Sequence, residues 1–228
     1  MNYTKPDIST LLSSFGEFSD LNGQTLNRLT EKISRKFFKK NEFIYLPDDP
    51  SLHLYLLKEG KVKVGKYSEE GKEMILRVNH DGDIFGELSL IPNECRGNFA
   101  QVTHGTAEVW IVSIQDIQDL MREDFDFSLR MTHIIGKKLI KTEKRMETLI
   151  FKDAKSRIVE FIKRIAGERG IPIGKETLIK TSLTHLDIAK LTATSRQTVT
   201  TTLNELKERN LIYFDRRRIL VRDMGALK

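Results

Sequence analysis

The stretch SRQTVTTTLNELKERN, which begins at Ser195, gathers hydrogen-bonding side chains on one side of an expected helix. At about 100° per residue, the apolar Val199, Leu203 and Leu206 share one side. The other side and the amino-terminal end carry Arg196, Gln197, Thr200, Thr201 and Asn204. Arginine can pair with guanine, glutamine can pair with adenine, and threonine can hydrogen-bond a base or touch the thymine methyl group. Ser195 is expected to cap the helix, whose start favours a phosphate, so the pattern indicates a helix that reads DNA.

The neighbouring segments predict the rest of a winged helix-turn-helix. In LTHLDIAKLT, Thr184 can cap the preceding helix with Asp187 at the capping-box position. NLIYFDRRRILVRD then predicts a strand, a basic turn and a second strand. The basic turn holds Arg216, Arg217 and Arg218, which are expected to meet backbone phosphates. Helix, short turn, helix and hairpin is the order of a winged helix-turn-helix, whose second helix enters the major groove.

The distribution of charge along the chain also indicates that the carboxy-terminal third binds a negatively charged partner. The formal net charge is +6, and the residues from Phe151 onward hold 17 of the 38 Lys and Arg but only nine of the 32 Asp and Glu. This asymmetry indicates nucleic acid or an anionic surface as the partner of the carboxy-terminal third. Two alternatives stay open, a basic surface that is merely solvated and a winged helix that binds protein.

The segment from about Arg35 to Val112 predicts a small all-β unit. LHLYLLKEGKVKVGKY has apolar residues at period two, with Glu59 and Gly60 expected in a turn between two strands. YSEEGKEMILRV repeats the plan with Gly71 in the turn, and NFAQVTHGTAEVWIV predicts two more strands around Gly105. Turn signals at this spacing favour a sandwich or barrel.

A long helix follows, because the residues from about Ser113 to Ile150 contain no proline. Its seam advances in alternating steps of four and three, which is a coiled-coil pattern. The seam comprises Ser128, Thr132, Ile135, Leu139, Thr142, Met146 and Leu149. A helix of roughly 25 residues is about 37 Å long, which is more than the preceding unit needs. We therefore expect a homodimer through Ile135, Leu139, Thr142, Met146 and Leu149, with packing against the chain's own β unit as the alternative.

Two motifs resemble the catabolite activator and fumarate–nitrate regulator (Crp-Fnr) superfamily of transcription regulators. SRQTVTTTLNELKERNLI is similar to its recognition helix and wing entry, and GDIFGELSL followed by Arg96 resembles its cyclic-nucleotide-type roll. The resemblance implies an α+β fold with a β-roll (jelly roll) at residues 1–124, a dimerisation helix at 125–151 and a winged helix-turn-helix at 152–228. It also implies a dimeric, sequence-specific regulator that binds inverted-repeat DNA, and RNA polymerase as a partner if it activates transcription.

The resemblance implies an effector site in the roll. Glu87 matches the glutamate that holds a ribose, Arg96 the arginine that neutralises a cyclic phosphate, and Thr142 a hydroxyl on the dimer helix. A buried phosphate needs a fixed cation, and guanidinium offers paired donors. Gly97 and Glu143 depart from the family pattern, since cyclic-AMP binders tend to have hydroxyl residues there. A cyclic nucleotide, another small ligand or gas-linked signal, and no effector all stay open.

Other chemistries find less support in the sequence. An iron–sulfur cluster needs about four cysteines and only Cys95 is present, so no such cluster is expected. Cys95 is expected to be a buried, inert thiol, and one thiol suits a reducing cytoplasm. No spacing supports haem ligation by His53, His80, His104 or His133, and His53 lacks the His-x-His partner of a metal-dependent roll enzyme, which is the alternative function. No membrane span, metal site or secretory signal is expected.

Overall fold

The computed structural model describes residues 12, 15–91, 95–181, 183–215 and 218–227. The chain divides into two compact units, one formed by the residues up to Gly71 with Leu76–Ile140, the other by Lys72–Ile75 with Lys141–Lys228. In the described part of the chain, no helix is long and apolar enough to cross a membrane.

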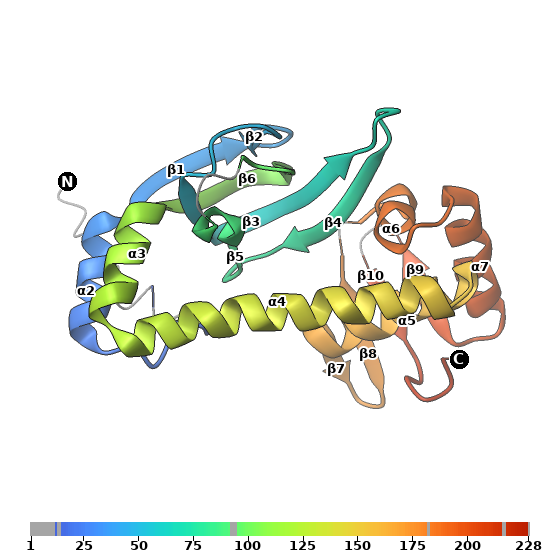
Figure 1. Ribbon diagram of the computed structural model, residues 1–228. Coiled ribbons are helices and arrows are strands. Elements are labelled where there is room, and N and C mark those ends of the chain that lie inside the picture. The colour runs from blue at the N-terminus through green and yellow to red at the C-terminus, as the bar shows by residue number, and fades with distance from the viewer. Residues whose placement is uncertain (1–11, 13–14, 92–94, 182, 216–217, 228) are drawn as a thin grey trace, which may run out of the picture. The chain divides into compact units, whose positions relative to one another are not determined.

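An antiparallel sheet forms the framework of the first unit (Figure 1). Its strands are β1 (Ser34–Lys39), β2 (Phe43–Tyr45), β3 (His53–Tyr67), β4 (Glu73–Asn79), β5 (Ile84–Phe85) and β6 (Phe99–Ser113). The main order is β1-β6-β3-β4, while β2 pairs with β6 and β5 pairs with β3. The short 3-10 helix η1 (Glu87–Leu90) follows β5 directly. The predicted β-roll is confirmed, and the turn between β3 and β4 contains Gly71, as expected.

Two predicted turns are wrong, because Gly60 and Gly105 lie inside long strands. β3 and β6 each run for 15 residues, and their pairing shifts register between Leu57 and Val62. Gly60 has φ of +114°, and a Cβ at this position would lie 2.8 Å from the Cα of Ala107. The bulge therefore needs glycine for both conformation and space, and it bends the paired strands without ending them.

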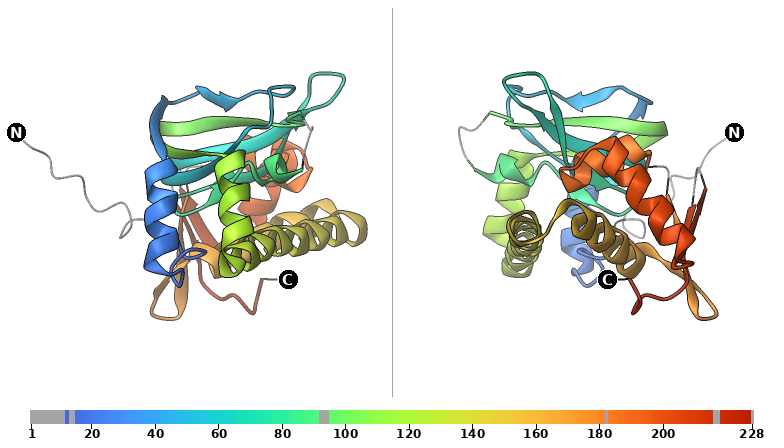
Figure 2. Two further views of the ribbon diagram at one scale, coloured as in Figure 1. Left: turned by 60° about the vertical axis from the view of Figure 1, so that its left-hand side comes forward. Right: turned by 90° about the vertical axis from the view of Figure 1, so that its right-hand side faces the viewer.

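The first part of β3 is buried on both of its faces, where residues 54–57 form a continuous apolar run. Leu54 and Leu56 pack with helices α2 (Gly23–Lys32) and α3 (Ile114–Glu123) in one cluster. The alternate residues Tyr55 and Leu57 belong to a second cluster inside the roll. Figure 2 shows α2 and α3 side by side at one end of the sheet. Successive residues of β3 point to opposite faces of the sheet, so the alternating residues pack in two different cores.

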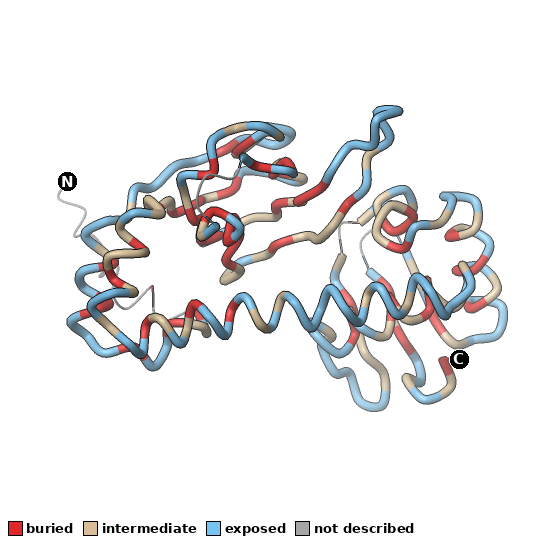
Figure 3. The backbone as a smooth tube through the Cα atoms, viewed as in Figure 1, coloured by how far each residue is buried: buried red, intermediate tan, exposed pale blue. Residues whose placement is uncertain are grey.

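The predicted long helix is α4, which runs for 27 residues from Phe125 to Phe151. Phe127, Met131 and Ile134 are buried in the core of the first unit. Figure 3 shows that the buried positions of α4 lie in its first half. The predicted apolar seam residues Ile135, Leu139, Met146 and Leu149 are 43%, 58%, 55% and 40% exposed. Packing against the chain's own β unit therefore uses a different stripe of the helix from the seam.

The second unit combines three helices with a small antiparallel sheet. Its elements after α4 are α5 (Ala154–Arg169), β7 (Ile171–Ile173), β8 (Glu176–Lys180), α6 (His185–Thr192), α7 (Arg196–Glu208), β9 (Ile212–Asp215) and β10 (Arg218–Val221). The sheet order is β7-β8-β10-β9. Val199, Leu203 and Leu206 of α7 join the core that α5 begins with Ile158 and Ile162. The predicted order of helix, turn, helix and hairpin is confirmed, with β7 as an unexpected additional strand.

Candidate DNA-binding surface and effector pocket

Two local caps place the pair of helices. Thr184 accepts from the backbone of Asp187 and the Asp187 carboxylate accepts from Thr184 N, which is the predicted capping box. Ser195 Oγ accepts from Thr198 N at 3.0 Å, so α7 begins where the sequence predicts. Between the helices, Ala193 has φ of +51°, a left-handed conformation that glycine adopts more readily.

Arg157 of α5 fixes the turn between these helices. Its Nε donates to Thr192 O at 2.8 Å and its Nη2 donates to Ala193 O at 2.9 Å. A cation at these carbonyls also complements the negative end of α6. The role of Arg157 could not be predicted from the sequence, because its partners are 35 and 36 residues away.

The surface of α7 carries the predicted polar residues. Arg196, Gln197, Thr201 and Asn204 are exposed and Thr200 is half-buried. Thr202, the last of the three consecutive threonines, is only 3% exposed and belongs to the interior. Arg218 in the hairpin is exposed and pairs with Asp215 at 2.7 Å. Arg216 and Arg217 lie outside the described residues.

In the first unit, Glu87 and Arg96 line one cavity of the roll. The lining residues are Tyr45, Ser51, Arg77, Gly86, Glu87, Leu88, Cys95, Arg96, Gly97 and Asn98. The cavity volume is about 20 Å³, whereas sites for drug-sized ligands span about 300–1,000 Å³. A ligand as large as a nucleotide therefore requires the lining side chains to rearrange. Cys95 is exposed, so the expectation of a buried thiol is wrong; it lies at an isolated β-bridge with Pro50, outside the named strands.

Arg96 is held by neutral groups inside the roll. Its Nη2 donates to His53 O at 2.7 Å and to Ser89 Oγ at 3.0 Å. Its guanidinium lies 4.0 Å from the ring centre of Tyr45. Gly86 permits this approach, since a Cβ there would lie 2.7 Å from Tyr55 and 3.2 Å from Arg96. Arg96 is only 5% exposed, and the hydrogen-bond partners of its guanidinium in the described part of the chain are neutral.

Glu87, in contrast, is neutralised within the unit. Its carboxylate pairs with Arg77 at 3.1 Å and with Lys138 of α4 at 2.6 Å. Burial raises the pKa of Glu87, but Lys138 and Arg77 outweigh burial and leave this pKa below its usual value. Burial lowers the pKa of Lys138 to about 8, although Glu87 acts against this shift. Neither cation was singled out from the sequence, where they stand 10 and 51 residues from Glu87.

Two further residues from the sequence analysis, Thr142 and His53, lie outside these networks. Thr142 is exposed on α4. His53 is half-buried in β3, and burial followed by the charge of Arg96 lowers its pKa. Among the described residues, no cluster of three or more His, Cys, Asp or Glu is arranged to hold a metal ion.

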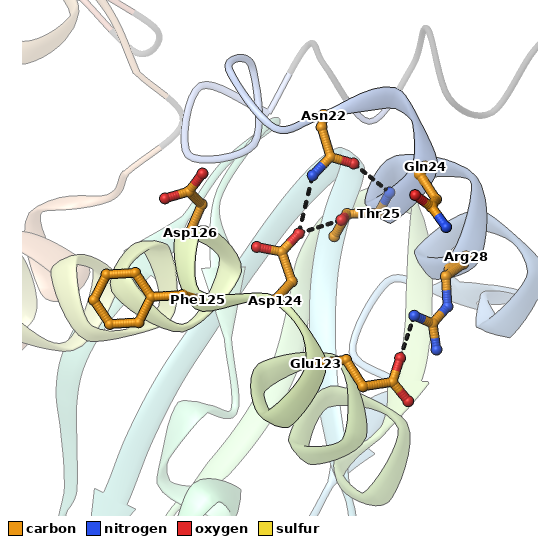
Figure 4. A pocket seen from close by; sticks show the side chains of 8 residues that line it. All are labelled: Asn22, Gln24, Thr25, Arg28, Glu123, Asp124, Phe125 and Asp126. Carbon is orange, nitrogen blue, oxygen red and sulfur yellow. Dashed lines mark hydrogen bonds and ion pairs between the residues drawn. The ribbon is translucent and has the colours of Figure 1, made fainter.

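A larger, polar pocket of about 380 Å³ lies where α2 meets the start of α4 (Figure 4). Asp124 is central to it and accepts from Asn22 Nδ2 at 3.1 Å, from the Thr25 hydroxyl and from Phe127 N at 3.0 Å. The hydrogen bond from Thr25 is the main cause that lowers the pKa of Asp124. Arg28 and Glu123 form an ion pair to one side of Asp124. This network fixes the residue at which α4 begins.

Comparisons with known proteins cover both units. The cyclic nucleotide-binding domain model matches residues 35–124, and the Crp-like helix-turn-helix domain model matches residues 156–228. The global nitrogen regulator of Synechocystis sp. is 30% identical over 191 residues, which cover 83% of this chain and 85% of that protein. The CRP-like cAMP-activated global transcriptional regulator of Mycobacterium tuberculosis is 25% identical over 222 residues, covering 96% and 98%. The structure of a CooA mutant from Carboxydothermus hydrogenoformans matches with a TM-score of 0.76 at 26% identity, covering 91% and 89%.

Proposed function

The chain belongs to the Crp-Fnr family of DNA-binding transcription regulators, and from this premise we propose that it acts as a homodimer on inverted-repeat DNA. The cyclic nucleotide-binding domain is its effector-sensing part, and it is a regulator rather than an enzyme. In this function, residues 1–124 sense the effector, residues 125–151 form the dimer and residues 152–228 bind DNA. The protein would act in the cytoplasm, and RNA polymerase would be a further partner if it activates transcription.

The exposed face of α7 is the observation that carries the proposed mode of DNA binding. Arg196 and Gln197 lie in its first turn, beside a serine-capped amino-terminal end. That end of a recognition helix meets base edges, and a two-fold dimer requires two half-sites about 34 Å apart. The exposed apolar residues of the α4 seam support the dimer, because monomers rarely leave a large apolar patch in water.

The specificity of α7 is tested by replacing Arg196. A site is first selected from random DNA, and an inverted repeat is expected. Arg196→Ala is expected to weaken binding to this site by about 1–3 kcal/mol and to relax one guanine position, because it removes a bidentate base contact. Gln197 is expected to read a neighbouring adenine.

The control is Arg217→Ala, a change in the run of three arginines from Arg216 to Arg218. It is expected to weaken selected and scrambled DNA alike and to lower the salt slope by about one ion. Both variants are titrated on both DNAs at several salt concentrations. An equal loss for Arg196→Ala on both DNAs would reduce Arg196 to a phosphate contact.

For the effector, we propose a small anion that enters the cavity between Glu87 and Arg96. Arg96 and Arg77 provide two guanidinium groups at this cavity against the single carboxylate of Glu87. A cyclic nucleotide is one such anion, and the name of the mycobacterial relative describes activation by cAMP. An anion that draws Arg77 or Lys138 from Glu87 would alter the contact between η1 and α4. Leu139 of the proposed dimer seam directly follows Lys138, which gives the effector a route to the spacing of the recognition helices.

Calorimetry with cyclic AMP and cyclic GMP tests the cyclic-nucleotide form of this proposal. If either binds, Arg96→Ala is expected to abolish the heat, because the phosphate loses its fixed cation. Glu87→Gln is expected to weaken binding, since the carboxylate would accept from the ribose hydroxyl. Thr142→Ala serves as the variant on the dimer helix and reports whether its hydroxyl takes part. Absence of heat with both nucleotides would retire the cyclic nucleotide while leaving DNA binding unaffected.

A further inference from the structure

The hydroxyl group of Thr200 is engaged on two sides. Thr200 Oγ1 donates to the carbonyl oxygen of Arg196 at 3.0 Å, one helical turn earlier. The same oxygen lies 2.9 Å from Nδ1 of His185, the first residue of α6. A threonine hydroxyl has only one hydrogen, and Thr200 donates it to the carbonyl oxygen of Arg196. His185 must therefore donate from Nδ1, and Thr200 Oγ1 accepts.

His185 is itself supported by a third element. Its ring centre lies 5.8 Å from that of Phe214 in β9. The imidazole thus connects the start of α6, the first turns of α7 and the wing. Because threonine is branched at Cβ, holding its oxygen restricts χ1 and with it the position of its methyl group.

We infer that Thr200 recognises a thymine through a methyl–methyl contact, and that His185 is the positioning residue that directs the Thr200 methyl group toward the base. With its hydroxyl committed to Arg196 and His185, the γ-methyl is the group that Thr200 has left for a base edge. The thymine 5-methyl is the apolar feature of the major groove. This inference rests on the proposed DNA-binding mode of α7.

Thr201 offers a matched comparison on the same helix. It is exposed, and its hydroxyl makes no hydrogen bond to another described residue. Its hydroxyl can donate or accept at a base edge, whereas that of Thr200 cannot do so without breaking a contact. At a base edge, Thr201 can therefore offer its hydroxyl, whereas Thr200 offers its methyl group.

The experiment removes single methyl groups from the DNA. Each thymine in one half-site of the selected site is replaced in turn by deoxyuridine, which lacks only the 5-methyl group. With the natural protein, one such replacement is expected to weaken binding about fourfold, the scale of one buried methyl group. A half-site with no deoxyuridine-sensitive thymine would overturn the inference.

Protein variants then assign that penalty to a side-chain group. Thr200→Val keeps a methyl and removes the hydroxyl. Because valine has one strongly preferred rotamer in a helix, this methyl needs no hydrogen-bond partner to hold it, and the deoxyuridine penalty is expected to persist. Thr200→Ser keeps the hydroxyl and removes the methyl, so the penalty is expected to vanish at that thymine. Thr201→Ser, the control, is expected to leave it unchanged. A penalty that survives Thr200→Ser, or disappears in Thr200→Val, would show that the methyl of Thr200 is not the reader.

His185→Ala tests the positioning role separately. It is expected to reduce the deoxyuridine penalty while leaving affinity for scrambled DNA unchanged, because the Thr200 hydroxyl then keeps only its bond to the Arg196 carbonyl oxygen and its rotamer is held less firmly. An unchanged penalty would remove His185 from the inference. If the natural protein binds selected and scrambled DNA equally, the proposed function of α7 fails instead, and this result is distinguishable from loss of the methyl contact alone.

Discussion

Replacing Leu139 by glutamate is expected to dissociate the homodimer. Leu139 is 58% exposed in the single chain and lies at the middle of the seam on α4. A two-fold interface would bury one new carboxylate from each partner, and an unpaired buried charge costs several kcal/mol. At micromolar protein, sedimentation velocity is expected to show monomer for the variant and dimer for the natural chain.

The control for this substitution is Ile140→Glu on the same helix. Ile140 is 53% exposed but lies off the seam, so the same charge there is expected to leave the dimer intact. Leu139→Glu is also expected to lose the tight binding of an inverted repeat and to keep the weaker binding of one half-site. A dimer that persists in Leu139→Glu would rule out the seam as the interface.

Glu87→Gln is expected to lower the free energy of unfolding by about 3 kcal/mol or more at pH 7. Glu87 is 7% exposed and balances two cations, Arg77 and Lys138. Removing its charge leaves both cations in the roll without their carboxylate. Lys138→Met is the matched control, with a smaller expected loss because Glu87 then keeps Arg77. Urea unfolding measures both variants.

The pH dependence of this deficit has a definite sign. The pKa of Lys138 in the folded protein is about 8, below the ordinary 10.5 of the unfolded chain. Between these values the unfolded chain binds more protons, so the contribution of Lys138 to stability rises with pH. In Glu87→Gln, the carboxylate that raises the pKa of Lys138 is absent, so Lys138 loses its proton at a lower pH than in the natural protein. The loss of this charge removes the repulsion between Lys138 and Arg77 in the variant. The deficit is therefore expected to be smaller at pH 9 than at pH 7, and an equal deficit at both would contradict the assigned role of Lys138.

Sequence information was sufficient where the determining interactions are local. Thr184, Asp187 and Ser195 cap their helices through residues three positions away, so their roles follow from spacing. The helical period likewise separates the buried Val199, Leu203 and Leu206 from the polar face of α7. The long helix α4 was predictable for the same reason, since it depends on the local helical repeat, whereas the dimer through its seam stays a prediction.

Only the tertiary structure decided the interactions between distant segments. Gly60 resembles a turn residue locally, yet the pairing of β3 with β6 keeps it inside a strand. The surroundings of Glu87 depend on Lys138, and those of Thr200 on His185, because chain folding brings together residues 51 and 15 positions apart. Residue types therefore determined which part of the chain reads DNA and which part forms the roll. The tertiary contacts decided the protonation, pairing and orientation of the side chains in each site, because these depend on neighbours that no local period specifies.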